Sequence, residues 1–414
     1  MPKIGILSLG CARNLVDSEV ILGRLKNKGY QIVNLDKADV VLVNTCAFIQ
    51  EAKEESIQVI LDLIELKKLG SLKKIIVAGC LSQRYKHKLV KELPEIDAFL
   101  GTMSLNHTRQ RFPISPSHYT YVKICEGCIN NCSFCVIPKL KPHFRSLAVD
   151  SILQEIEDLD TGSCREINII GQDITAYGWD LYREFRLTHL LKSILKSLKN
   201  KKWIRLLYLS PERVSKELLQ LIADNPAIVK YIDLPIQHIN NRILKSMKRG
   251  IDKSKILKLI ERIRKMIPEA AIRTSLIVGF PGETDKEFKE LLDFIKEVKF
   301  ERLGVFIYSR EENTAAFDFK HQLPQEVKEA RFDLIMSSQQ EIAYAVNKRY
   351  QAKKLEVLID EKREDGLYVG RSQFDAPEVD GLVYVKSKKD IAIGSFVNVK
   401  IIDTLEYDLV GELQ

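Results

Sequence analysis

Apolar runs alternate with longer amphipathic stretches along the first hundred residues. The runs predict strands over residues 3–9, 38–45 and 73–79, and the stretches predict helices over about residues 15–28, 51–69 and 84–92. Near-continuous apolar strands separated by helices are typical of a parallel sheet that is covered on both faces. The pattern therefore predicts a doubly wound α/β domain. We expect its three strands to be neighbours, in the flavodoxin-like order 2-1-3.

The middle of the chain continues this alternation. Six apolar runs predict strands over residues 121–124, 166–173, 203–209, 231–237, 271–280 and 302–308. Helices are expected near residues 149–159, 185–199, 213–223, 240–266, 284–298 and 325–349. Six such units fall short of the eight that close a TIM barrel. We therefore expect an open six-unit (βα) partial barrel.

From about residue 351 the pattern changes to short runs separated by turns that contain Gly or Pro. The runs cover residues 354–360, 367–372, 381–385, 395–402 and 407–413. Five short strands in a segment of this size are typical of a small closed barrel of the OB type. The chain thus divides into residues 1–115, 116–350 and 351–414, and the last of these domains is expected to be all-β.

The composition narrows the class of protein. With 45% hydrophobic and 29% charged residues, the chain of 414 residues has the balance of a globular protein. No apolar run approaches the roughly 18 residues that span a bilayer, so we expect no membrane partner and a cytoplasmic location. The net charge is +8, yet residues 351–414 carry 13 acidic and only 9 basic side chains. This acidic domain suits a basic protein segment better than nucleic-acid phosphates.

Three of the eight cysteines follow the predicted strands of the first domain, at Cys11, Cys46 and Cys80. Because ligands of doubly wound sheets bind beyond the carboxyl ends of the strands, we expect the three thiols to converge. Each cysteine alone is most simply a small buried apolar residue, but three at equivalent places favour a metal centre. The spacing leaves open an iron–sulfur cluster with one free iron and a zinc site with an open position.

Four further cysteines lie close together in the central segment, at Cys125, Cys128, Cys132 and Cys135. Zinc ribbons and fingers usually separate two cysteine pairs by a dozen or more residues, far more than here. The last three cysteines have the spacing C-x3-C-x2-C, which resembles the signature of the radical S-adenosylmethionine superfamily. The resemblance implies a 4Fe-4S cluster whose fourth iron chelates S-adenosylmethionine. Cys125 lies outside the signature and is expected to be a structural thiol, and Cys164 is expected to pack in the core.

Chemistry in such barrels gathers at the carboxyl ends of the strands. Residues at these positions, together with the aromatic residue inside the cysteine motif, are our candidates for cofactor binding: Phe134, Gln172, Asp173, Gln237, His238, Gly279 and Glu283. Ser210, Glu212 and Gly282 occupy similar places. The alternative for the segment VGFPGET is a plain turn in which Thr284 caps a helix. A single histidine such as His238 is more often a hydrogen-bonded scaffold residue than a catalyst.

The whole chain resembles the methylthiotransferase family, and the segments SLGCARNLVDSE, NTCAFIQEAKEESI and RSQFDAPEVDG resemble its RimO-like branch. The resemblance implies an iron–sulfur first domain, a radical S-adenosylmethionine partial barrel and a C-terminal TRAM barrel. It also implies two 4Fe-4S clusters, one on Cys128, Cys132 and Cys135 and the other on Cys11, Cys46 and Cys80. The chain departs from the family where Cys125 replaces a Ser or similar residue, and around Arg145, where a Gly and a second Arg are usual.

The resemblance implies a reaction as well. The cluster of the barrel would reduce S-adenosylmethionine, and the resulting radical would remove hydrogen from the β-carbon of an aspartate in small-subunit ribosomal protein twelve, free or within the assembled subunit. The other cluster would supply the methylthio group, and a flavodoxin or ferredoxin would supply electrons. Asp375, Glu378 and Asp380 are expected to contact the ribosomal protein, although they also suit a solvated loop. A tRNA methylthiotransferase of the MiaB-like branch and a non-catalytic redox or metal-storage protein stay open as alternatives.

Overall fold

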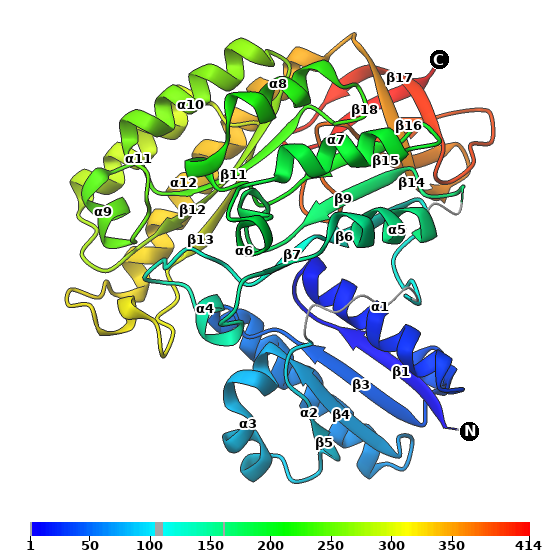
Figure 1. Cartoon of the computed structure of the whole chain (residues 1–414). Coiled ribbons are helices and arrows are strands. Elements are labelled where there is room, and N and C mark those ends of the chain that lie inside the picture. Colours follow the sequence, from blue (N-terminus) through cyan, green and yellow to red (C-terminus); the bar gives the residue numbers. More distant parts are fainter. Residues whose placement is uncertain (1, 104–110, 160–161) are drawn as a thin grey trace.

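The computed structural model of the chain describes residues 2–103, 111–159 and 162–414. Three bodies follow one another along the sequence, and in Figure 1 the first lies below the large central one while the small C-terminal barrel lies at the upper right. Among the described residues, no helix combines the length and the apolar character that crossing a bilayer requires.

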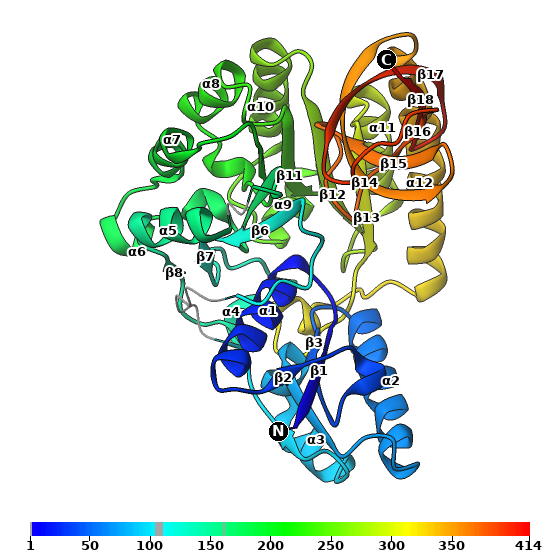
Figure 2. The same ribbon diagram turned by 90° about the vertical axis from the view of Figure 1, so that its right-hand side faces the viewer.

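The first domain is a parallel five-stranded sheet. Its strands are β1 (Lys3–Ser8), β2 (Gln31–Ile32), β3 (Val40–Thr45), β4 (Lys74–Gly79) and β5 (Ala98–Phe99). Its helices are α1 (Ala12–Asn27), α2 (Gln50–Lys68) and α3 (Cys80–Glu92), with a 3-10 turn η1 (Leu35–Lys37). Figure 2 shows α1 and α2 on opposite sides of the sheet, so the doubly wound arrangement expected from the sequence is present.

The order of the three long strands differs from our prediction. The sheet runs β2-β1-β3-β4-β5, which makes β3, and not β1, the middle one of the three. The short strand β2 pairs with the outer side of β1, and its two residues are too few to show any hydrophobic pattern. Counted with β2, the order of the sheet is the flavodoxin-like one, and the carboxyl ends of β1, β3 and β4 are still adjacent.

The central domain is the open partial barrel that the sequence predicts. Its strands are β6 (Tyr119–Lys123), β9 (Glu166–Ile170), β10 (Trp203–Leu206), β11 (Tyr231–Gln237), β12 (Ala271–Val278) and β13 (Arg302–Ile307). They form two parallel sheets, β10-β9-β6 and β11-β12-β13. The covering helices are α5 (Val149–Leu159), α7 (Leu187–Ser197), α8 (Lys216–Asp224), α10 (Lys253–Met266), α11 (Asp285–Val298) and α12 (Gln325–Asn347).

Several short elements of this domain have no counterpart in our prediction. They are β7 (Cys125–Glu126), α4 (Ile137–Leu140), β8 (Arg145–Ser146), α6 (Trp179–Tyr182) and the 3-10 turns η2 (Ile174–Ala176), η3 (Pro211–Arg213) and η4 (Ala315–Asp318). The helix expected over residues 325–349 ends in a further 3-10 turn, η5 (Lys348–Tyr350). The single helix expected over residues 240–266 is in fact α9 (Asn241–Ser246) and α10. It is interrupted where Lys248 has a positive φ, and the Asp252 side chain caps α10.

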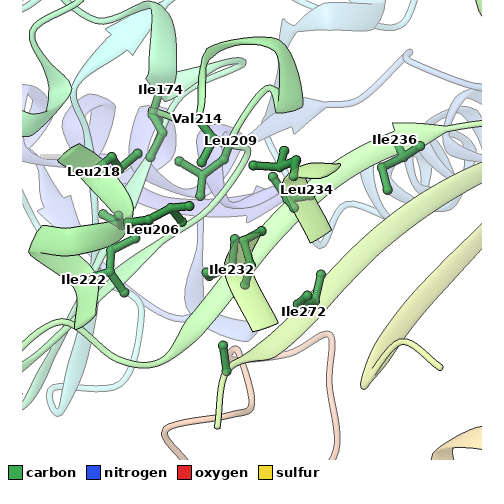
Figure 3. Packing of buried hydrophobic residues seen from close by; sticks show 14 of the residues in the cluster. Ile174, Leu206, Leu209, Val214, Leu218, Ile222, Ile232, Leu234, Ile236 and Ile272 are labelled. Carbon is green, nitrogen blue, oxygen red and sulfur yellow. The ribbon is translucent and has the colours of Figure 1, made fainter. Parts of the chain in front are cut away.

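The core of the barrel lies between its strands and the covering helices. Figure 3 shows side chains of β10, β11, β12 and α8 and of the loops beside them packed against one another, including Ile174, Leu206, Leu209, Val214, Leu218, Ile222, Ile232, Leu234, Ile236 and Ile272. Cys164 is buried in the same core, which confirms its expected role. This packing fixes the strands whose carboxyl ends carry the candidate site.

The C-terminal domain is a closed barrel of five strands, as predicted. The strands are β14 (Lys354–Glu364), β15 (Leu367–Ser372), β16 (Val383–Lys386), β17 (Phe396–Thr404) and β18 (Leu409–Leu413), in the order β14-β15-β16-β18-β17. Its apolar core continues into the central domain, because Trp203 and Tyr231 pack in the same cluster as Val357 and Val383. The last two domains therefore share a buried seam.

The acidic segment at this seam corrects one of our predictions. Asp375 is 1% exposed and forms an ion pair with Arg302 of the central domain. Asp380 accepts a hydrogen bond from the Tyr231 hydroxyl at 2.5 Å. Only Glu378 is exposed. The expectation that all three contact a ribosomal protein is wrong, because Asp375 and Asp380 are used to hold the barrel in place, and Glu378 accepts a hydrogen bond from the Tyr119 hydroxyl of β6 at 3.0 Å.

Candidate active site

The C-x3-C-x2-C segment lies between β7 and α4, and its three thiols are partly exposed. The backbone N–H of Asn130 donates a hydrogen bond to Cys128 Sγ at 3.4 Å, and Arg249 Nη1 donates one to Cys132 Sγ at 3.6 Å. Burial raises the pKa of Cys128 to about 11 and that of Cys135 to about 12. Thiols with such a high pKa stay protonated near neutral pH unless a metal binds them.

These thiols open onto a cavity of about 420 Å³, a size typical of small-molecule sites. Of the predicted cofactor-binding residues, four line the cavity: Phe134, Gln172, Asp173 and Gln237. Gln172 Oε1, Ser210 Oγ and Arg249 Nε in its wall are buried and have no hydrogen-bond partner among the described residues. Because buried polar groups are nearly always paired, these three indicate a polar ligand. They fit the amino and carboxylate groups of S-adenosylmethionine.

The cysteine loop does not have the geometry of a site for a single metal ion. Within residues 2–103, 111–159 and 162–414, no three His, Cys, Asp or Glu side chains are grouped closely enough to hold one metal ion. A four-iron cluster is larger than an ion, and its three cysteine ligands bind three different irons. Thiols spaced around the edge of a cavity therefore fit such a cluster better than they fit zinc.

Asp173 links the cysteine loop to the barrel wall. Its carboxylate forms an ion pair with Arg213 and accepts a hydrogen bond from Asn130 Nδ2 at 2.9 Å. It also accepts one from the backbone N–H of Thr175 at 3.1 Å. Arg213 Nη2 in turn donates to Asn130 Oδ1 at 2.9 Å. This closed set of hydrogen bonds fixes the shape of the loop that carries Cys128.

The structure brings the three cysteines of the first domain to one edge of its sheet. Cys11 precedes α1, Cys80 begins α3, and Cys46 follows β3. Burial together with the charges of Cys46 and Cys11 raises the pKa of Cys80 to about 12. Burial would raise the pKa of Cys11 too, but the neighbouring Arg13 guanidinium outweighs it and the net shift is downward. The three thiols are therefore near enough to influence one another.

Arg13 connects this edge of the first domain to the barrel. Its Nε donates to Cys11 Sγ at 3.4 Å, and its Nη1 donates to the Gly171 carbonyl at 3.1 Å. The guanidinium lies 4.8 Å from the centre of the Tyr208 ring. Arg13 lines the cavity, together with Phe48 of the same domain. Arg13 thus joins the edge that carries Cys11 to the wall of the cavity.

Three of the predicted cofactor-binding residues are behind the cavity wall. His238 is fully buried, its Nδ1 accepts the Asn240 backbone N–H at 3.0 Å, and burial lowers its pKa to about 4. Glu283 pairs with Arg331 at 2.7 Å and accepts the Gly279 N–H at 3.1 Å. These contacts support the scaffold role that the sequence left open for His238. Thr284, as expected, caps α11.

Comparison with known proteins follows the same three-part division. The residues matched are 3–101 for the family described as uncharacterized protein family UPF0004, 122–295 for the radical SAM superfamily, and 353–413 for the TRAM domain. Over its full length the chain is 46% identical to the ribosomal protein uS12 methylthiotransferase RimO of Clostridioides difficile, of which 99% is covered. Identity to the protein of the same name is 48% in Thermoanaerobacter, covering 100% of both chains, and 45% in Aquifex aeolicus, covering 99% of this chain and 96% of that one.

The chain belongs to the RimO family. It is therefore a radical S-adenosylmethionine methylthiotransferase, an enzyme that uses S-adenosylmethionine and an iron–sulfur cluster. Among solved structures, the fold resembles the methyltransferase TsrM from Kitasatospora setae, with a TM-score of 0.55 and 13% identity over 76% of this chain and 73% of that one. It also resembles the radical enzyme OxsB, with a TM-score of 0.51 and 12% identity over 83% of this chain and 56% of that one. The predicted fold class is confirmed.

Sequence reasoning missed several residues of this RimO-family site. Arg13, Asn130, Arg213 and Arg249 all contact the cysteines or Asp173. Arg13 and Asn130 stand two residues from a cysteine of a motif, and that proximity was a usable signal. Arg213 and Arg249 carried no such signal, since Arg213 ends the 3-10 turn η3, Arg249 lies in the loop between α9 and α10, and both reach the site only through the curvature of the barrel.

Proposed function

We propose that this RimO-family enzyme attaches a methylthio group to the β-carbon of an aspartate in ribosomal protein uS12. The observation that carries the proposal is the full-length similarity to relatives whose name states this substrate. The C–H bond at this carbon is too weakly acidic for a general base, so a cofactor has to supply a radical. The similarity favours this substrate over the adenosine of a tRNA, which was the alternative.

Two 4Fe-4S clusters complete the proposal. Cys128, Cys132 and Cys135 would hold the cluster that binds S-adenosylmethionine, and Cys11, Cys46 and Cys80 would hold the second one. When bound, the first cluster together with S-adenosylmethionine would supply a deoxyadenosyl radical, and the second cluster would supply a methylated sulfur. Among the chain's own residues, Gln172, Ser210 and Arg249 would orient the polar end of S-adenosylmethionine. All three lie in the cavity wall, and each has a buried polar atom without a hydrogen-bond partner among the described residues.

The mouth of the cavity supports a protein substrate. Three exposed apolar residues line it, one from each domain: Phe48, Phe306 and Val379, which are 40%, 44% and 59% exposed. A polynucleotide requires cations along its phosphates, whereas an apolar rim suits a polypeptide loop that inserts one side chain. The buried contacts of Asp375 and Asp380 hold Val379 at this mouth. The C-terminal barrel would thus touch the substrate through Val379.

Iron counting after anaerobic reconstitution tests the two clusters. Replacing Cys128, Cys132 and Cys135 with Ala should remove about half the iron and abolish formation of deoxyadenosine, because the two ligand sets lie in separate domains. The same change at Cys11, Cys46 and Cys80 should remove the other half but spare deoxyadenosine. The Cys125→Ala variant is the control, because this thiol is fully buried on β7 and should leave all iron in place. Loss of all iron in either triple variant would contradict two independent sites.

Mass spectrometry tests the substrate. The reconstituted enzyme is incubated with S-adenosylmethionine, a reductant and either isolated uS12, small ribosomal subunits or bulk tRNA. We expect a methylthio group on one aspartate of uS12, in one or both protein samples, and none on tRNA. A modified adenosine, with uS12 unchanged, would assign the enzyme to the tRNA-modifying branch instead.

A further inference from the structure

The loop that follows β13 binds two cations of the first domain. Glu311 of this loop lines the cavity, and its side chain is only 2% exposed. Its Oε2 accepts hydrogen bonds from Lys53 Nζ of α2 at 2.9 Å and from Arg84 Nη1 of α3 at 2.6 Å. Removal of one partner from such a buried ion pair leaves the other charge unpaired, so the contact is costly to break. We call Glu311, Lys53 and Arg84 the β13 joint.

The other carboxylate oxygen of Glu311 connects the loop to the start of α2. Ser309 Oγ donates to Glu311 Oε1 at 2.6 Å and accepts the backbone N–H of Gln50 at 3.2 Å. Gln50 is the first residue of α2, and Ile49 before it offers no side-chain cap. A serine oxygen is a preferred acceptor for the free N–H groups at the start of a helix. The barrel therefore caps a helix of the first domain.

Glu311 keeps its negative charge near neutral pH. Burial would raise the pKa of its carboxyl group, but the hydrogen bonds from Ser309, Lys53 and Arg84 outweigh burial, and the net shift is downward. Both carboxylate oxygens accept hydrogen bonds. The carboxylate is therefore suited to hold its neighbours in place and not to carry a proton.

The β13 joint extends to the backbone around Cys46. Arg84 Nη1 also donates to the carbonyl of Ala47, one residue after Cys46, at 3.2 Å. The Cys46 backbone N–H donates to Ser56 Oγ at 3.2 Å, and Ser56 Oγ donates to the Cys46 carbonyl at 2.9 Å. Ser56 lies three residues after Lys53, on the same face of α2. The β13 joint thus holds the segment that carries a predicted cluster ligand.

The same joint fixes one side of the cavity mouth and the surroundings of a second cysteine. Phe48, which lines the cavity, lies between Cys46 and the start of α2. Arg84 lies one turn after Cys80, the first residue of α3, and residues four apart share a face of a helix. Contacts with a single loop of the barrel therefore act near two of the three cysteines of the first domain.

We propose that Glu311 and Arg84 are positioning residues of methylthio transfer. They hold the cysteine edge of the first domain toward the cavity, so that sulfur bound there faces the substrate carbon. The proposal rests on the proposed function, because only the transfer step requires a fixed orientation of the first domain relative to the barrel. Deoxyadenosine forms within the barrel and does not depend on the joint. A misplacement of about 1 Å between reacting groups can lower a rate about a hundredfold.

A double-mutant cycle tests this role. The variants are Glu311→Ala, Arg84→Met and the two combined, each reconstituted with iron and given S-adenosylmethionine, a reductant and uS12. We expect the iron content to be retained and deoxyadenosine to form at nearly the normal rate, while methylthio product per deoxyadenosine falls about tenfold or more. The double variant should lose no more than either single variant, because the two residues act as one unit.

Hydrogen exchange, measured before iron is added, gives a second test. In Glu311→Ala and Arg84→Met the backbone amides of residues 46–54 should exchange faster, because the contact to Ala47 and the cap of α2 are lost or weakened. The matched control is Glu312→Ala. This exposed neighbour accepts a hydrogen bond from Arg84 Nη2 at 2.7 Å through its carbonyl, which the substitution keeps. The control should leave both the exchange and the product ratio unchanged.

Four results would overturn the positioning role. An unchanged product ratio in both single variants, despite faster exchange, would show that the joint only stabilises the fold. Equal losses of deoxyadenosine and product would show that the residues act on the barrel itself, and loss of iron would show that they act on cluster binding. Additive losses in the double variant, or the same loss in Glu312→Ala, would contradict a joint formed by this pair. Absence of methylthio product from the unaltered protein would instead contradict the proposed function, and the exchange result does not depend on it.

Discussion

Arg13 connects the first domain to the barrel, because its guanidinium touches Cys11, the Gly171 carbonyl and the Tyr208 ring. Three simultaneous contacts require a planar, branched cation, which a straight aliphatic chain cannot replace. The residue also lines the cavity, so in the proposed reaction it would guide sulfur from the first domain toward the substrate carbon.

The Arg13→Met variant should therefore separate the two half-reactions. We expect both clusters to be retained and deoxyadenosine to form at nearly the normal rate, while methylthio product falls by roughly tenfold or more, as expected when a positioning contact is lost. The measurement is the ratio of product to deoxyadenosine in one reaction, and Arg13→Lys should recover part of it by restoring the charge. An unchanged ratio in Arg13→Met would exclude this positioning role.

His238 makes the barrel sensitive to acid. Burial lowers its pKa to about 4, whereas an unfolded chain has a histidine pKa near 6.5. Between these values the unfolded state binds a proton that the folded state does not, so stability falls as the pH falls from 6.5 toward 4. At pH 5 the loss is about 2 kcal/mol relative to pH 7.

Both tryptophans, Trp179 and Trp203, belong to the central domain, so denaturation followed by tryptophan fluorescence reports on the barrel. The His238→Gln variant should lose about 2 kcal/mol less than the unaltered protein between pH 7 and pH 5. The same substitution at the exposed His189 should keep the full loss. Identical pH dependence in all three proteins would show that His238 does not titrate in this way.

At the scale of elements, the turn between β4 and α3 places Cys80. Gly79 there has a φ of +94°, and a Cβ added to it would lie 2.4 Å from Asn44 Oδ1 and 2.5 Å from the Thr45 carbonyl. Two backbone segments of the sheet edge can approach this closely only because the residue has no side chain. The glycine therefore fixes the position of the cysteine that follows it.

Gly79→Ala should disturb the first domain and remove its iron, because the clash adds to the cost of about 1 to 3 kcal/mol for alanine at a φ of +94° and a ψ of −156°, a region that essentially only glycine adopts. The iron on Cys128, Cys132 and Cys135 should remain. Gly70→Ala is the control: Gly70 also has a positive φ, of +79°, but no atom lies within 4 Å of its added Cβ. That variant should keep all iron. Iron analysis combined with limited proteolysis distinguishes the outcomes, and full iron in Gly79→Ala would refute the argument.

Strands and helices with a clear hydrophobic period were predictable from the sequence, and those without such a period were not. The long strands and helices of all three domains follow from hydrophobic periodicity, because each has one side against a core. The two-residue strand β2 and the one-turn helix α6 are too short to show a period, yet β2 takes the place beside β1 that we had expected for a longer strand. The break between α9 and α10 depends on the positive φ of Lys248. Lysine rarely adopts this conformation, so the residue type did not predict the break.

For the whole molecule, the seam between the last two domains depends on buried charge. Glu166 of β9 accepts hydrogen bonds from Arg205 at 2.7 Å and from Arg371 of the C-terminal barrel at 2.6 Å. Arg302 is paired with Asp375 across the same seam. A sequence shows charges but not their partners. The acidic segment was therefore interpreted as an exposed contact site, although Asp375 is buried and paired with Arg302.

Removal of one partner from such a pair leaves the other charge buried. Asp375→Ala should destabilise the seam by about 3–5 kcal/mol, because Arg302 is 6% exposed and would keep its charge without a carboxylate. Glu378→Ala, three residues away and exposed, loses only the hydrogen bond that it accepts from the Tyr119 hydroxyl and should cost about 1 kcal/mol. Trp203 packs against Phe396 at this seam with ring centroids 4.8 Å apart, so its fluorescence reports separation. Similar stability of the two variants would contradict the assignment.

The continuous core between the last two domains has a consequence for how the protein is made. A ribosome releases the N-terminal residues first, so the barrel edge around Trp203, Tyr231 and Arg302 is complete before the segment that covers it has left the exit tunnel. During that interval the edge presents apolar rings and an unpaired cation to chaperones and proteases. A chain that ends early, before residue 351, never covers this surface. Truncated molecules should therefore be removed by the cell, and few would persist to bind iron and S-adenosylmethionine without transferring sulfur.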